Sequence, residues 1–277
     1  MRTLQLPSGQ SIPALGMGTW RMGERRRDRQ SEIAALRHGL DLGFSLIDTA
    51  EMYGEGGAEE VIAEAITNRR SEVFLVSKVY PHNASKQGAI AACERSLKRL
   101  QTDYLDLYLL HWRGSVPLAE TLDALQTLQQ QGKIRSYGVS NFDVADMEEA
   151  MPLPGGEAIA SNQVLYNLQR RGIEVNLLPW CRQRGIPVMA YSPIEQGRLL
   201  NDATLKLIAK ERNVTTAQVA IAWLLHQPDI IVIPKSSNIS HVEQNYATLK
   251  LKLTESELDR LDKAFPTPTR ATPLAML

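Results

Sequence analysis

Four side chains of this 277-residue sequence could together deliver a proton to a carbonyl oxygen: Asp48, Tyr53, Lys78 and His111. Asp48 and Lys78 each end a short apolar run, and an ion pair between them would offset the cost of burying either charge. Tyrosine, with an ordinary pKa of about 10, is a weak acid at neutral pH, and a neighbouring ammonium lowers that pKa. We therefore expect Lys78 to tune Tyr53 as a proton donor.

His111 completes this set. A neutral histidine held by one hydrogen bond would orient a substrate oxygen or share the proton, because histidine titrates near physiological pH. Each residue alone has an ordinary structural explanation: Tyr53 as a packing residue, Lys78 as a solvated side chain, Asp48 as a turn cap, His111 as a core histidine. Only their joint position at strand ends favours the catalytic interpretation.

The elements that must position these side chains form a repeated pattern of short apolar runs and longer amphipathic segments. The expected strands are residues 14–18, 44–47, 73–77, 104–110, 136–140, 158–163, 187–191 and 230–234. The expected helices are residues 29–42, 57–69, 85–100, 117–131, 143–150, 174–184, 202–227 in two parts, and 240–264. Eight strand-helix repeats without a linker predict an α/β fold, a single (β/α)8 TIM barrel spanning residues 1–277.

Two further features of the chain bear on this fold. Alternating apolar residues around Pro7-Ser8-Gly9 predict an N-terminal β-hairpin. The main rival is a doubly wound dinucleotide-binding fold, which requires GxGxxG after the first strand. Gly16 and Gly18 are followed by Arg21, so the third glycine is missing.

The second half of the chain resembles a site for a nucleotide cofactor. Tyr191 offers a flat aromatic face for a nicotinamide ring, and Ser140, Asn141 and Gln163 offer groups suited to a carboxamide. The last strand is followed by Lys235, Ser236, Ser237, Asn238 and an apparent capping box from Ser240 to Glu243. A helix N-terminus beside a lysine binds phosphate well, and barrels commonly use this region for it, so we prefer phosphate binding to simple capping.

Composition excludes several other functions. Thirty-one basic and thirty-one acidic side chains leave no net charge, so nucleic acid is not expected as a partner. We expect a cytoplasmic protein, since there is no signal peptide or apolar run of about 18 residues, and Cys93 and Cys181 lack CxxC spacing. Neither HExxH nor GxSxG occurs, so we expect no metal ion and no serine hydrolase.

The motifs along the chain resemble the aldo-keto reductases. They are GMGTW (16–20), IDTAEMYG (47–54), VSKV (76–79), LYLLHW (107–112), GVSNF (138–142), NQVLYN (162–167), AYSPI (190–194) and IPKSSN (233–238). The bacterial methylglyoxal reductase type is the most similar. The resemblance implies a barrel that binds NADPH without a Rossmann motif and reduces aldehydes or ketones, including methylglyoxal, by direct hydride transfer.

The resemblance also implies a role for each matching residue. Tyr53 would be the general acid, Lys78 and Asp48 would tune it, and His111 would orient the carbonyl. The implied cofactor-binding residues are Gly18, Thr19, Trp20, Asp48, Ser140, Asn141, Gln163, Tyr191, Ser192, Pro193, Ile194, Gly197, Ile233, Pro234, Lys235, Ser236, Ser237, Asn238, His241, Gln244 and Asn245.

Two departures from the family pattern concern the cofactor. His241 stands where the family often has an arginine, and Gln244-Asn245 where it often has Glu-Asn. Neutral histidine attracts phosphate less than a guanidinium, so the preference for NADPH over NADH is less secure.

We expect an aromatic, weakly charged substrate pocket lined by Trp20, Tyr80, His82 and Trp112. Because about 13 residues follow the last expected helix, we expect an open site and a broad range of small carbonyl substrates. The sequence fits a monomer.

Two alternatives to a reductase remain. The barrel could be a nicotinamide-binding regulatory module with little turnover, although the complete set of four polar residues argues against this. It could also be a lyase or isomerase that uses Lys78 as a Schiff base, which needs no NADPH.

Overall fold

The computed structural model describes residues 2–277 and has eight parallel strands at its centre. They are β3 (Met17–Gly18), β4 (Leu46–Asp48), β5 (Phe74–Val79), β6 (Leu105–Leu110), β7 (Ile134–Ser140), β8 (Ile159–Leu165), β9 (Val188–Tyr191) and β10 (Ile230–Val232). Neighbours in sequence are neighbours in the sheet. Parallel bridges join Leu15 to Val232 and Gly18 to Lys235, so the sheet closes on itself. The predicted (β/α)8 barrel is confirmed.

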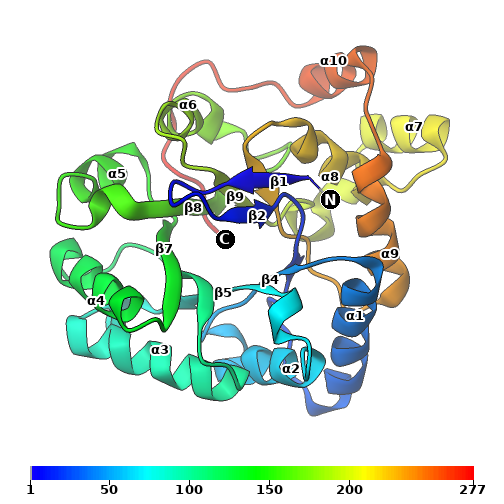
Figure 1. Ribbon diagram of the computed structural model, residues 1–277. Coiled ribbons are helices and arrows are strands. Elements are labelled where there is room, and N and C mark those ends of the chain that lie inside the picture. The colour runs from blue at the N-terminus through cyan, green and yellow to red at the C-terminus, as the bar shows by residue number, and fades with distance from the viewer. Residues whose placement is uncertain (1) are drawn as a thin grey trace.

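The helices surround the barrel, as Figure 1 shows. They are α1 (Arg29–Leu42), α2 (Gly57–Ala65), α3 (Lys86–Leu100), α4 (Leu118–Gln130), α5 (Val144–Ala150), α6 (Leu177–Gln183), α7 (Ala203–Arg212), α8 (Thr216–His226), α9 (Ile239–Ala247) and α10 (Glu255–Ala264). Within residues 2–277, no helix combines the length and hydrophobicity needed to cross a membrane.

Three predicted helices have different boundaries. The segment 57–69 is helical only to Ala65, with Ile66 as its C-cap, and Asn68 beyond it has a left-handed φ of 62°. The segment 174–184 becomes α-helical only from Leu177, after the Asn176 side chain caps it. The segment 240–264 contains α9 and α10, and α10 begins afresh after Thr254, which forms a capping box with Glu257. The periodicity of apolar residues predicts one long helix here, but the cap at Thr254 starts a new helix within it.

The predicted N-terminal hairpin closes one end of the barrel. It consists of β1 (Thr3–Gln5) and β2 (Ser11–Pro13), which pair in antiparallel fashion. Its apolar residues Leu6 and Ile12 are buried in the same cluster as Leu107 and Leu109 of β6 inside the barrel. Because this end is filled with apolar side chains, the polar groups of the barrel lie at the other end.

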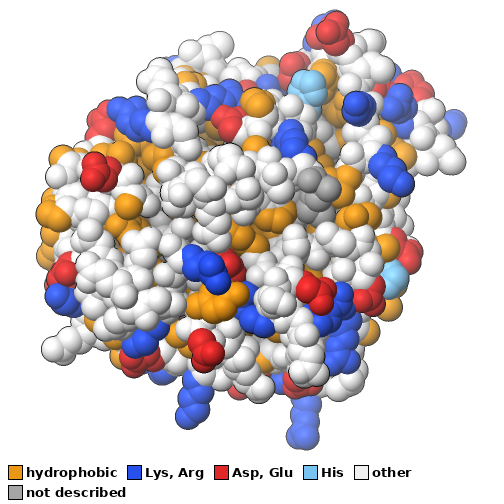
Figure 2. Space-filling model, in the orientation of Figure 1, with side chains coloured by type: hydrophobic (Ala, Val, Ile, Leu, Met, Phe, Trp, Pro, Cys, Tyr) orange, Lys and Arg blue, Asp and Glu red, His pale blue; other side chains and the backbone are white. Residues whose placement is uncertain are grey.

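A second apolar core lies between the strands and the helices. β6 contributes Tyr108 and Leu110 to it, so successive residues of the strand face opposite cores. Burial on both faces explains why the strands are nearly continuous apolar runs. The exposed face in Figure 2 mixes lysine and arginine with aspartate and glutamate side chains.

Candidate active site

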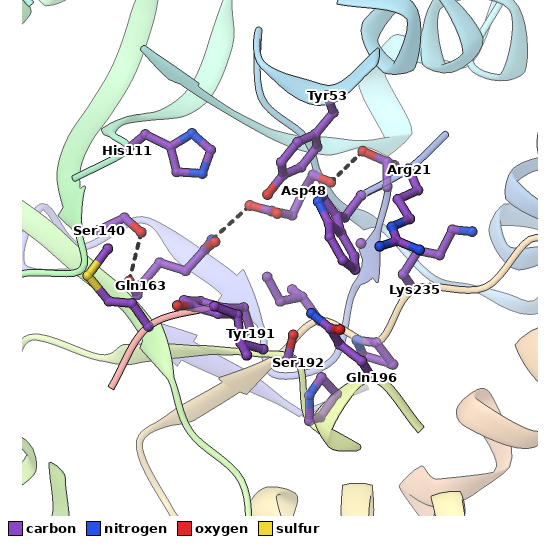
Figure 3. A pocket seen from close by; sticks show the side chains of 18 of the residues that line it. Arg21, Asp48, Tyr53, His111, Ser140, Gln163, Tyr191, Ser192, Gln196 and Lys235 are labelled. Atoms are coloured by element: carbon purple, nitrogen blue, oxygen red, sulfur yellow. Dashed lines mark hydrogen bonds between the residues drawn. The ribbon is translucent and has the colours of Figure 1, made fainter. Parts of the chain in front are cut away.

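A cavity of about 440 Å³ opens at the carboxyl ends of the barrel strands. Its lining residues are Gly18, Thr19, Trp20, Arg21, Asp48, Met52, Tyr53, His111, Trp112, Ser140, Asn141, Gln163, Tyr191, Ser192, Pro193, Ile194, Gln196, Gly197, Ile233, Pro234, Lys235, Met276 and Leu277. Figure 3 shows Asp48 and Tyr53 near the middle, with His111 and Ser140 to one side and Arg21 and Lys235 to the other.

A buried ion pair forms the base of the cavity. The Lys78 ammonium lies 2.8 Å from Asp48 Oδ2 and donates a second hydrogen bond of 2.7 Å to the carbonyl oxygen of Thr49. The two side chains are 0% and 3% exposed. Gln163 donates a 2.8 Å hydrogen bond to the other oxygen, Asp48 Oδ1. These bonds satisfy both charges, which makes their burial tolerable.

Tyr53 reaches the ion pair from the turn that follows β4. This turn spans Tyr53–Gly56 and needs glycines, because Gly54 and Gly56 have φ values of 58° and 93°. A Cβ at Gly54 would also lie 2.9 Å from the carbonyl oxygen of Met22. The turn leaves the Tyr53 hydroxyl 3.5 Å from Lys78 Nζ.

The pKa of Tyr53 differs from the sequence-based expectation. We expected Lys78 to lower it, but burial, followed by the negative charge of Asp48, raises the pKa of Tyr53 well above its ordinary value of 10.0. The physical reason is that the closer partner of Lys78 is Asp48, which neutralises its charge, while desolvation disfavours a phenolate. The phenol therefore stays protonated and can act as a proton donor.

His111 follows β6 and faces Tyr53. The two ring centroids are 5.8 Å apart in an edge-to-face arrangement. Burial, followed by the charge of Lys78, lowers the pKa of His111 to about 2, so the imidazole is neutral at physiological pH. Its buried Nδ1 has no hydrogen-bond partner in the described part of the chain. We expected one hydrogen bond to hold the imidazole, and Nδ1 does not make it. Of the two roles expected for His111, the low pKa favours orienting a substrate oxygen over sharing the proton.

Hydroxyl and amide groups form a network beside His111. Asn141 has a left-handed φ of 57°, and its side-chain amide donates to the His111 carbonyl oxygen at 3.1 Å. The Tyr191 hydroxyl donates to Asn141 Oδ1 at 3.0 Å. The Ser140 hydroxyl donates to the carbonyl oxygen of Gln163 at 2.8 Å. β7, β8 and β9 thus supply groups of the type that bind a carboxamide, next to one aromatic ring.

Positive charge lies toward β3 and β10. Arg21 and Lys235 line this part of the cavity. The barrel wall is close-packed here, because a Cβ at Gly18 would lie 2.8 Å from the carbonyl oxygen of Ile233. The two positive side chains, next to a place where two backbone segments come close together, could bind an anionic group such as phosphate.

The start of α9 corrects one sequence-based expectation. Asn238 is the N-cap, since its side chain accepts from the backbone N–H of His241 at 3.3 Å. The helix begins at Ile239, so the predicted capping box from Ser240 to Glu243 is wrong. Asn238 takes the cap because its backbone is extended and its side chain can reach back to the first turn.

Comparison with known proteins decides the family. The aldo/keto reductase family pattern matches residues 14–265. The chain belongs to the aldo/keto reductase family. The reductase is 54% identical to methylglyoxal reductase YeaE of Escherichia coli strain K12, over 100% of this chain and 99% of that protein. It is 35% identical to glyoxal reductase of Bacillus subtilis strain 168, over 94% and 91% of the two chains.

Solved structures agree with this assignment. A Klebsiella pneumoniae aldo-keto reductase in complex with NADPH superimposes with a TM-score of 0.97 at 50% identity, covering 100% of the reductase and 99% of that chain. A Klebsiella pneumoniae aldo/keto reductase in complex with NADP and acetate gives the same TM-score and identity and covers 99% of each chain. The predicted family, fold and oxidoreductase class are confirmed.

Several predicted site residues lie outside the cavity lining. Tyr80 and His82, expected at the substrate, stack on each other at 4.6 Å, and Tyr80 contacts the edge of Trp112. Neither ring lines the cavity, and Tyr80 packs against Trp112, which does. The other residues outside the lining are Lys78, which is buried beneath it, and Ser236, Ser237, Asn238, His241, Gln244 and Asn245 at α9.

The sequence did not identify five residues of the lining: Arg21, Met52, Gln196, Met276 and Leu277. Arg21 directly follows the GMGTW segment, so its position beside a predicted cofactor-binding motif could have identified it. No motif near Met276 and Leu277 indicates that they reach the cavity. Met276 and Leu277 come from the tail after α10, which ends near the barrel axis in Figure 1. The site is therefore less open than the short tail led us to expect.

Burial of neutral His111 should make stability depend on pH. Its pKa of about 2 lies below the ordinary 6.5, so between these values the unfolded chain binds a proton that the folded chain does not. Stability must then fall as the pH falls, by about 2 kcal/mol for this group between about pH 7 and 5. Denaturant unfolding of His111→Gln should show a pH dependence smaller by this amount. Equal pH dependence in wild type and variant would mean that folded His111 takes up its proton over the same pH range as in the unfolded chain.

Deleting Met276 and Leu277 should widen the substrate range. Both side chains are about half exposed and form a cavity wall without contributing to the ion pair. We expect kcat/KM for bulky aromatic aldehydes to rise at least about 5-fold, since a small change of wall volume is worth about 1 kcal/mol or more. Leu207→Ala, which trims an equally exposed side chain on α7, is the control and should have no effect. An unchanged substrate profile would place the tail outside the substrate path.

Proposed function

We propose that the reductase converts small aldehydes and dicarbonyls such as methylglyoxal to alcohols, with NADPH as the hydride donor. The observation that carries this proposal is the protonated Tyr53 hydroxyl, which lines the cavity 3.5 Å from Lys78 Nζ. The methylglyoxal and glyoxal reductases among its relatives support the substrate class. The apolar wall of Trp20, Trp112 and Met52 suits a small uncharged carbonyl.

The proposed proton path runs through Tyr53. When bound, NADPH supplies a hydride to the carbonyl carbon. Tyr53 donates its proton to the carbonyl oxygen, and the Lys78 ammonium stabilises the phenolate that remains. Asp48 holds Lys78 in place through the 2.8 Å ion pair. Neutral His111 orients the same carbonyl oxygen through a hydrogen bond from its ring.

The cofactor would lie along the rest of the cavity. Ser140, Asn141 and Gln163 would hold the carboxamide by exchanging their present hydrogen bonds, and Tyr191 would stack on the nicotinamide ring. Lys235, with the newly identified Arg21, would face the phosphates. The remaining proposed contacts are Gly18, Thr19, Trp20, Asp48, Ser192, Pro193, Ile194, Gly197, Ile233 and Pro234 in the cavity lining, and Ser236, Ser237, Asn238, His241, Gln244 and Asn245 around α9.

The Schiff-base alternative meets a geometric obstacle. Lys78 is 0% exposed, does not line the cavity, and is held by both Asp48 and Thr49. A substrate carbonyl would have to displace these bonds to reach the amine. Trapping of a substrate on Lys78 by borohydride would revive this alternative.

We also propose that the reductase acts as a cytoplasmic monomer formed by one domain, residues 1–277, of which residue 1 lies outside the described range. Cys93 and Cys181 are buried and free, and burial raises the pKa of each thiol to about 12, which suits a reducing compartment. Among the described residues, the large exposed hydrophobic side chains outside the cavity are Leu207 and Ile239, on separate helices. Size-exclusion chromatography with light scattering tests the monomer.

Tyr53→Phe tests the reaction itself. The variant keeps the ring but loses the proton donor, so turnover of methylglyoxal should fall by about 10²- to 10⁴-fold. The measurement is the loss of NADPH absorbance at the nicotinamide band. Tyr104→Phe removes a hydroxyl before the first residue of β6, at the far end of the barrel, and should keep full activity. Full turnover by Tyr53→Phe would refute the assignment.

Lys235→Ala tests the cofactor preference. If Lys235 meets the additional phosphate of NADPH, KM for NADPH should rise by roughly 10-fold or more, while KM for NADH changes little. Lys263→Ala, which removes a lysine from α10, is the control for net charge. An equal change for both cofactors would place Lys235 away from that phosphate.

A further inference from the structure

The segment from Ser192 to Gly197 forms one wall of the cavity and has an unusual backbone. Ser192, Glu195 and Gln196 have φ values of 49°, 50° and 55°, and Gly197 has 90°. A left-handed conformation in residues other than glycine costs on the order of 1 kcal/mol each and persists only when the surroundings enforce it. Something must therefore hold this segment in shape.

Glu195 provides that support. Its neighbours Ile194 and Gln196 line the cavity, but Glu195 does not, and it is 0% exposed. Its Oε1 accepts from Arg170 Nε at 3.0 Å and Nη2 at 2.9 Å, and from Arg198 Nη2 at 3.1 Å. Arg198 belongs to the same turn as Glu195, so the two bonds from Arg170 are the ones that fasten the segment to the loop that follows β8.

Asn167, which is also 0% exposed, links Ser192 at the start of the segment to Glu195. Its amide nitrogen donates to Glu195 Oε2 at 2.8 Å and to the carbonyl oxygen of Ser192 at 2.9 Å. Its carbonyl oxygen accepts from the backbone N–H groups of Gln169 and Arg170. A change at Glu195 therefore loosens a connected group of buried polar contacts.

We propose that Glu195 is a positioning residue that sets how tightly NADPH is held and how fast it leaves. The inference rests on the proposed function, which places the cofactor against Ser192–Gly197. A wall held in its bound shape costs little ordering on binding, whereas a released wall must be ordered each time. Glu195 touches neither the proton path nor the carbonyl, so its effect falls on the cofactor.

The sign of the effect separates this mechanism from simple electrostatics. Glu195→Gln removes a negative charge close to the site of an anionic cofactor, and the loss of this repulsion alone would tighten NADPH binding. Loss of the anchor predicts weaker binding. The same variant thus gives opposite results under the two explanations.

The experiment compares Glu195→Gln, Arg170→Met and the double variant. The Kd for NADPH is measured by quenching of protein fluorescence, and the release rate by stopped flow. We expect each single change to raise Kd and the release rate by roughly 10-fold, and the double variant to be no weaker than either single variant. kcat/KM for methylglyoxal should stay the same, because the reduction step is untouched, and kcat should stay the same or rise, because cofactor release often limits turnover.

Asp106→Asn is the matched control. Asp106 pairs with Arg70 at 2.8 Å and is 7% exposed, but it is the second residue of β6 and lies at the end of the barrel opposite the cavity. This variant should lower thermal stability without changing the Kd for NADPH. That outcome excludes general destabilisation as the cause of weaker binding.

Two results would overturn the inference. One is a Kd for NADPH in Glu195→Gln that equals or falls below that of the wild type. The other is full additivity of Glu195→Gln and Arg170→Met, which would mean that Arg170 contacts the cofactor by itself. A wild type that binds NADPH but reduces no carbonyl would refute the proposed function, whereas the Kd comparison would still decide the role of Glu195.

Discussion

The ion pair between Lys78 and Asp48 is the constraint on which the site depends. Two charges are almost completely removed from water, and each would be costly without the other. Their meeting requires that β4 and β5 pair in one register, in which Asp48 lies opposite Val76 and Lys78 extends two residues further. The Thr49 N–H, bonded to the Val76 carbonyl oxygen, continues this pairing past the strand end. A shift in strand pairing would therefore leave both charges buried and unpaired.

This pair also decides what Tyr53 can do. A free ammonium would favour the phenolate, but an ammonium already neutralised by Asp48 leaves desolvation as the larger influence on the Tyr53 pKa. A phenol that keeps its proton is ready to protonate a carbonyl. Lys78 then becomes important only after the transfer, when a phenolate at 3.5 Å needs a positive charge. The ion pair therefore leaves Tyr53 protonated before the transfer and supplies a positive charge beside the phenolate after it.

The sequence was sufficient for the barrel and for the four central residues because both depend on regular geometry. Parallel strands bring their carboxyl ends together, so Asp48, Lys78 and His111 were predicted to meet before any distance was known. The direction of the Tyr53 pKa shift was not predictable, because it depends on a balance of burial and two opposite charges. The Leu277 wall was not predictable either, since it depends on the path of an irregular tail over the barrel.

The cavity has walls formed by strand ends and walls formed by irregular segments, and these differ in how readily they can be altered. Asp48 ends β4 and His111 directly follows β6, and both strands are buried on both faces, so any movement there disturbs two cores. The Ser192–Gly197 segment is fixed by the few polar contacts of Glu195 and Asn167. Met276 and Leu277, at the end of the tail, are about half exposed. Local stability is lowest where buried contacts are few. Cofactor affinity and substrate range can therefore be altered in these segments while the proton-donating geometry is preserved.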